Sequence, residues 1–206
     1  MNQETIHSLG RVMRANTTGF IVGVRVLQPQ LPSFGALLRA RASGGVEILG
    51  LVYDVAIDDD LFIRQLLASP RLDTPQAETI IADQRQNRQV PAEVSVLSVA
   101  YRQGEALRYA LPPQPPTLLD TVERCSDEEV KAFTANTDYF PLVLNAGGIV
   151  PADELLAASL REGARVRGLG GEDFLVKQGR ELIRLLANDP VRLDNLLRRI
   201  RPAGNV

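Results

Sequence analysis

Few residues of this chain could carry out catalysis, because histidine and cysteine each occur only once. His7 lies in the polar opening segment MNQETIHSLG, and the only cysteine is Cys125. Nucleophilic catalysis needs a histidine that is fixed against a serine or cysteine and oriented by an acid. Nothing in the sequence places His7 near Cys125 or near any serine. We therefore predict that the protein is not an enzyme and has no catalytic residues.

Acidic residues occur in runs that could bind a cation. Asp58-Asp59-Asp60 offers the oxygen ligands that a divalent cation prefers. The run directly precedes the apolar stretch 61–67, however, and acids at the beginning of a helix are favoured by capping and by the helix dipole. Glu128-Glu129 and Asp153-Glu154 also begin predicted helices. We interpret these acids as helix caps and predict no metal site and no cofactor.

Two glycine-rich stretches lack the full pattern of a phosphate-binding loop. They are Asn145-Ala146-Gly147-Gly148 and Gly168-Leu169-Gly170-Gly171, and neither contains the lysine of such a loop. The second leads into Glu172-Asp173, where a phosphate would need positive charge. We interpret the second stretch as the structural beginning of a helix.

The first half of the chain is typical of β-strands that are joined by tight turns. Alternating or β-branched runs cover residues 9–14, 20–27, 35–41 and 46–57. Two further strand patterns continue the sheet, over 92–101 and 106–111. Short, closely spaced strands favour a closed barrel or a compact sandwich over a βαβ architecture. Helical patterns occupy the interval between strands, about 58–90.

The second half is predicted to be mainly helical. Ser126 and Glu129 form a capping box, with Cys125 and Val130 placed as a hydrophobic staple. Amphipathic patterns then predict helices over 151–161, 172–188 and 191–200. The predicted fold class is α+β: a small closed β-barrel over 1–116 with a helical insertion at about 58–90, followed by a helical region over 117–206.

The order of these motifs resembles the HAS barrel, the small N-terminal barrel of HerA-type ring ATPases and rotary ATP synthases. The matching residues are Leu9-Gly10-Arg11-Val12, Phe20–Leu27, Gly35, Ile48–Val52, Ala92–Leu97, the run Pro112-Pro113-Gln114-Pro115-Pro116, Val122 and Ser126–Glu129. Pro116 stands where the family usually has glycine. The resemblance covers about 8–135 and implies an assembly module. Since no phosphate-binding loop follows, we expect a standalone barrel without the ATPase domain.

Charge is unevenly distributed along the chain. Residues 58–160 carry sixteen acids and eight basic residues, whereas 161–206 carry six acids and ten basic residues. This separation indicates complementary faces, either within the fold or between copies. No apolar stretch has the roughly 20 residues that cross a bilayer, and the N-terminus lacks the pattern of a signal peptide. We therefore expect a cytoplasmic protein without membrane insertion.

The leading functional hypothesis is an assembly or adaptor protein that acts in DNA processing. The resemblance implies that it self-associates, as a homo-oligomer, or docks on a HerA-like ATPase or an associated nuclease. The candidate partner-binding residues are Arg11, Arg25, Arg39 and Arg41 on barrel strands, and Leu182, Ile183 and Leu186 on the helix over 172–188. The alternative is a standalone barrel that binds nucleic acid. Its candidate residues are Arg192, Arg198, Arg199 and Arg201.

Overall fold

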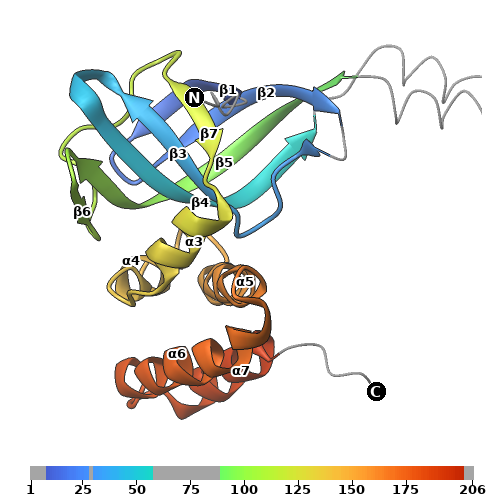
Figure 1. Cartoon of the computed structure of the whole chain (residues 1–206), viewed down its shortest axis with the longest axis vertical. Helices are drawn as coiled ribbons and strands as arrows, with labels where there is room; N and C mark the ends of the chain where they lie inside the picture. Colours follow the sequence, from blue (N-terminus) through green and yellow to red (C-terminus); the bar gives the residue numbers. More distant parts are fainter. Residues whose placement is uncertain (1–7, 28–29, 58–88, 202–206) are drawn as a thin grey trace, which may run out of the picture.

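The strands form an antiparallel sheet that closes on itself (Figure 1). The computed structural model describes residues 8–27, 30–57 and 89–201. Neighbouring strands follow the order β2-β1-β7-β3-β4-β5, and β2 also pairs with β5, so these six strands make a closed barrel, while β6 extends β5 outside it. The bounds are β1 (Ser8–Asn16), β2 (Gly19–Leu27), β3 (Leu37–Ala42), β4 (Val46–Ile57), β5 (Gln89–Gln103), β6 (Ala106–Arg108) and β7 (Thr121–Arg124).

Successive side chains of each strand point alternately to the inside of the barrel and to its outer wall. In β3, Leu38 and Ala40 are fully buried inside the barrel, whereas Leu37 and Arg39 lie on the outer wall. The ladder between β4 and β5 shifts register at Gly50. A Cβ atom there would lie 2.4 Å from Val96 Cγ1 and 2.7 Å from Leu97 O, so glycine permits the close approach of the two strands.

The predicted α+β barrel is confirmed, and its last strand lies beyond the predicted boundary. The strand patterns of the sequence do not include β7, which pairs with both β1 and β3. The barrel therefore extends to Arg124, past residue 116, and the proline run 112–116 connects two strands of the sheet. The predicted helical insertion lies outside the described residues, except for Gln89 and Val90, which begin β5.

The helices form two further layers on one side of the barrel. Their bounds are α3 (Asp127–Thr134), α4 (Phe140–Leu144), α5 (Ala152–Arg165), α6 (Gly171–Leu185) and α7 (Pro190–Ile200). Helices α3, α4 and α5 lie against the barrel, and α6 with α7 lies farthest from it (Figure 1). Helix α5 is central, because it contacts α3, α4, α6, α7 and β4.

A second apolar core joins the barrel wall to the helices. Leu37, Leu49 and Leu51 on the outer wall belong to the same cluster of buried side chains as α4 and α5. The predicted capping box at α3 is confirmed: the Ser126 hydroxyl accepts from the Glu129 N–H, and Glu129 Oε2 accepts from the Ser126 N–H at 2.8 Å. Helix α3 therefore begins directly after β7, the strand that completes the barrel.

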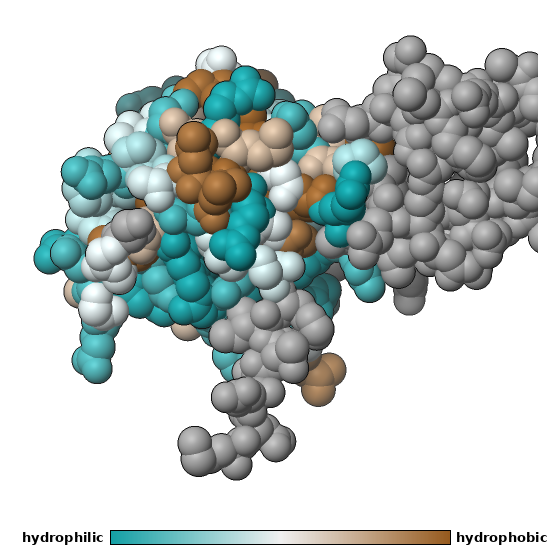
Figure 2. Space-filling view, turned by 90° about the horizontal axis from the view of Figure 1, so that it is seen from above, coloured by the Kyte–Doolittle hydropathy of each residue, from teal (hydrophilic) through white to brown (hydrophobic). Residues whose placement is uncertain are grey.

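The surface of the barrel that faces away from the helices is mostly polar and carries local apolar patches (Figure 2). The exposed apolar side chains of the barrel include Met13, Leu118 and Leu119. Within the described ranges, no helix is both long enough and apolar enough to cross a membrane.

Candidate protein-binding surfaces

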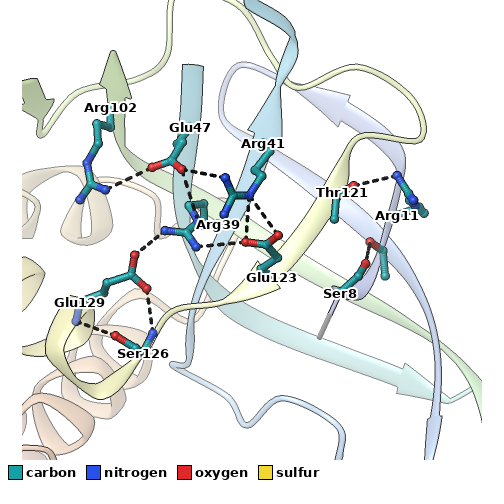
Figure 3. A network of polar contacts seen from close by, with 11 residues as sticks. Ser8, Arg11, Arg39, Arg41, Glu47, Arg102, Thr121, Glu123, Ser126 and Glu129 are labelled. Carbon is teal, nitrogen blue, oxygen red and sulfur yellow. Dashed lines mark hydrogen bonds and ion pairs between the residues drawn. The ribbon is translucent and has the colours of Figure 1, made fainter. Parts of the chain in front are cut away.

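Two of the predicted partner-binding arginines lie in a network of ion pairs on the barrel wall (Figure 3). Arg39 Nη2 donates to Glu123 Oε2 at 3.0 Å, and Arg41 Nε donates to the same carboxylate at 3.0 Å. Glu47 lies on the other side of both arginines and also accepts from Arg102 at 3.2 Å. The network therefore connects β3, β4, β5 and β7.

The same network fixes α3 against the barrel. Arg39 Nη1 donates to Glu129, the carboxylate that caps α3. The side chains of Arg39 and Glu123 are only 12% and 7% exposed, so both charges depend on these internal partners. Burial lowers the pKa of Arg39, but its hydrogen bond to Glu123 and the charges of Glu129 and Glu47 outweigh burial and raise it. Arg39 thus serves the contact between barrel and helices, and it offers little surface to a partner.

The other two predicted arginines of the barrel lie on its exposed side. Arg11 Nη1 donates to Thr121 Oγ1 at 2.7 Å and to the carbonyl of Leu119 at 3.1 Å, which fixes the turn before β7. Arg25 is exposed on β2. Arg11 and Arg41 both lie opposite Thr121 in the register of the sheet, so these two arginines are neighbours on the outer wall of the barrel.

An apolar groove lies between α6 and α7. It has a volume of about 450 Å³, and its walls come from Leu175, Val176, Gly179 and Ile183 on α6 and from Leu197 and Ile200 on α7. Val176 and Ile183 are 57% and 52% exposed and lie seven residues apart, so they share one face of the helix. The charged side chains of Glu172, Arg180 and Arg201 border the groove.

The three predicted apolar residues of α6 divide between the core and this groove. Leu182 is fully buried, and Leu186 is 8% exposed, so both belong to the second core. Ile183 alone lines the groove. Val176 and Leu197, which also line the groove, are not among the predicted partner-binding residues, although both lie on the amphipathic helices predicted over 172–188 and 191–200. The groove, rather than the predicted set, is the apolar surface that α6 leaves open.

The basic side chains of α7 are mostly engaged by acids of the same chain. Arg192 donates to both oxygens of Asp153, with the shortest contact at 2.7 Å, and this hydrogen bond is the main reason that the pKa of Arg192 is raised. Arg199 Nε donates to Glu154 Oε1 at 2.5 Å, and Arg198 pairs with Asp194 at 2.7 Å. Only Arg201, of the four nucleic-acid candidates, has no carboxylate partner among the described residues.

The Cys125 thiol is partly buried and the Tyr139 hydroxyl is fully buried within the fold. Burial is the largest cause that raises the pKa of the Cys125 thiol to about 12, and the charge of Glu129 adds to it. Burial likewise raises the pKa of Tyr139, whose hydroxyl lies 3.2 Å from that of Ser159. Across 8–27, 30–57 and 89–201, no three His, Cys, Asp or Glu side chains are grouped as metal ligands. His7 and Asp58–Asp60 lie outside the described residues.

No protein-family model and no curated protein matches this chain. The relationship to HAS barrels therefore rests on the motifs of the sequence. A small closed barrel of six antiparallel strands, followed by helices, is the part of that expectation which the structure confirms. Membership in the family stays a prediction.

Proposed function

We propose that this protein is a non-enzymatic assembly or adaptor protein that works through the groove between α6 and α7. The observation that carries the proposal is the exposure of Val176 and Ile183, which α7 leaves uncovered. A surface helix normally buries a single apolar stripe. Helix α6 buries Phe174, Leu175 and Leu182 toward the core, and its apolar stripe continues beyond them to Val176 and Ile183, which are exposed to solvent. Exposed apolar grooves with charged borders are typical of protein-binding sites.

The resemblance to HAS barrels supports a more specific role. In HerA-type ATPases and ATP synthases, this barrel is a module of ring assembly. A chain with that barrel and an open groove fits a component that self-associates or docks on a HerA-like ring ATPase or an associated nuclease. We place its activity in DNA processing on this resemblance.

Direct binding of nucleic acid has less support. A protein that binds phosphates needs arginines that are free to replace counterions. Arg192, Arg198 and Arg199 each pair with a carboxylate of their own chain. A binding face would have to break those pairs before it contacted a phosphate.

The proposal is tested by a double substitution in the groove, Val176→Glu with Ile183→Glu. Both side chains are about half exposed, so the charged variant should fold while the groove loses its apolar walls. We expect the variant to lose self-association in sedimentation velocity, or to lose capture of a purified HerA-like ATPase. Arg184→Glu, on an exposed position of the same helix, is the matched control. Assembly and capture that are equal in wild type, groove variant and control would contradict the proposal.

A further inference from the structure

A pocket between the barrel and α5 brings three arginines together. It has a volume of about 320 Å³, which is at the small end of the range for ligand-binding pockets. Arg124 is the last residue of β7, and Arg161 and Arg165 lie one turn apart on α5. The segment before β3 contributes Ser33 and Phe34 to the walls. The barrel and the helices thus build one basic pocket at their junction.

Arg165 is the member of the three that acids neutralise. Its hydrogen bonds to Glu162 and Asp127, both with contacts of 2.8 Å, raise the pKa of Arg165. Only its Nε and Nη2 atoms make these bonds, so Nη1 has no acceptor in the described part of the chain. Glu162 is the one acid among the residues that line the pocket. Three guanidiniums therefore lie near two carboxylates, of which one lines the pocket itself.

Arg124 and Arg161 have no carboxylate partner within the described residues. Arg124 Nη2 donates to the Gln30 carbonyl, and Arg161 Nη1 donates to the Arg199 carbonyl at 2.7 Å. Each guanidinium has five N–H donors, so most of their donors have no acceptor among these residues. Partial burial lowers the pKa of Arg124. Arg39, on the neighbouring strand β3, is also partly buried, yet the acids of the wall network raise its pKa. The charge of Arg124 lacks that compensation.

The helix dipole accounts for only part of this arrangement. Cations are favoured near the C-terminal end of a helix, and Arg161 and Arg165 lie in the last turns of α5. Arg124 comes from the barrel, so the dipole of α5 does not explain its place in the pocket. Like charges one helical turn apart repel each other, and a third guanidinium adds to the repulsion. An anion between the guanidiniums removes this cost and accepts their remaining hydrogen bonds.

We propose that this pocket binds the phosphate group of a small phosphomonoester. Guanidiniums pair with phosphate oxygens through two parallel hydrogen bonds. The three guanidiniums exceed the carboxylates of Glu162 and Asp127 by one charge, and that of Glu162 alone by two. A phosphomonoester carries about −1.5 to −2 at pH 7, which matches this excess. Phe34, Ala36 and Ala158 form the apolar part of the walls and contact the organic group of the ligand. The pocket shares no residue with the groove between α6 and α7.

Calorimetric titration with phenyl phosphate tests the site, because this probe joins a phosphate to an aromatic ring. Wild type should bind it and should not bind phenol. Arg124→Gln and Arg161→Gln should each weaken binding by about tenfold or more, since each removes a charged hydrogen bond. Arg25→Gln, at an exposed position of β2, is the matched control and should bind like wild type. Urea unfolding shows that each variant is folded, and either arginine variant alone is sufficient for the test.

Inorganic phosphate and DNA define the ligand class. Inorganic phosphate should bind more weakly than phenyl phosphate, and Phe34→Ala should reduce that difference. Phenyl phosphate that does not bind wild type, or that binds the two arginine variants equally well, would overturn the proposal. A single-stranded oligonucleotide that binds through Arg124 and Arg161, while phenyl phosphate does not, would assign the pocket to nucleic acid and would also overturn it. None of these variants alters the groove, so failure here leaves the proposed function untouched.

Discussion

At the scale of single residues, Glu123 is the side chain on which the barrel wall most depends. It neutralises Arg39 and Arg41 and is 7% exposed. We predict that Glu123→Gln lowers the free energy of unfolding by about 2 kcal/mol, since a buried guanidinium loses its charged partner. Urea unfolding measures this change.

The exposed pair Arg198–Asp194 provides the control for that substitution. Asp194→Asn should lower the free energy of unfolding by about 0.5 kcal/mol or less, as is usual for pairs one helical turn apart at the surface. Equal effects of the two substitutions would show that the wall network stabilises the fold no more than an exposed ion pair does.

The thiol of Cys125 gives a second prediction at this scale. Its pKa of about 12 means that the thiol stays protonated at pH 8.5, whereas a free cysteine is about half ionised there. Because the thiolate is the reactive form, labelling of the folded protein at pH 8.5 should be much slower than labelling in urea. The rate should rise as pH approaches the pKa. Equally fast labelling of folded and unfolded protein would refute the buried, structural environment of Cys125.

At the scale of elements, the segment before β3 packs directly against α5. Gly35 has a φ of +83°, and a Cβ atom there would lie 2.5 Å from Ala158 Cβ and 3.0 Å from the Ala158 carbonyl carbon. Gly35→Ala should therefore destabilise the protein by about 2 kcal/mol, because it adds both backbone strain and a clash. Gly147→Ala, where an added Cβ meets nothing within 4 Å, should change stability by less than about 0.5 kcal/mol. Chemical unfolding of the two variants distinguishes the positions.

Most elements follow from local patterns, and the missed ones are short. The strands β1 to β5 and the helices α3, α5, α6 and α7 have the alternation, capping or amphipathic spacing that predicts them, and the three-residue β6 lies within the longer strand pattern over 106–111. β7 has four residues and α4 has five, too few to establish a period. The strand β7 forms because β1 and β3 leave a gap between them, and the local sequence cannot express that requirement.

The groove shows the limit of prediction for the candidate site. Leu182 and Ile183 are adjacent apolar residues of one helix, yet the first is fully buried and the second is about half exposed. Which of the two side chains is exposed to solvent depends on how α5 and α7 pack on α6. The arginines also depend on tertiary packing, because Asp153 lies 39 residues from Arg192 and Glu123 lies 84 residues from Arg39 in the sequence.

At the scale of the whole molecule, part of the basic C-terminal segment forms ion pairs with the acidic middle segment within the fold. Basic residues of the C-terminal segment pair with acids of the preceding segment, as in Arg165–Asp127, Arg192–Asp153 and Arg199–Glu154. These pairs orient α5 and α7 relative to their neighbours. Among the described residues, the groove between α6 and α7 remains an open apolar surface on the helices.

The central claim, that this chain works by protein association through its open groove, is tested most directly by its mass in solution. Sedimentation equilibrium over a range of concentrations measures that mass without any partner or label. A chain that self-associates through this groove should give masses that rise with concentration toward multiples of 22.5 kDa, and Val176→Glu with Ile183→Glu should remove the rise. A mass of 22.5 kDa at every concentration, or a rise that is the same in the groove variant, would contradict self-association through the groove.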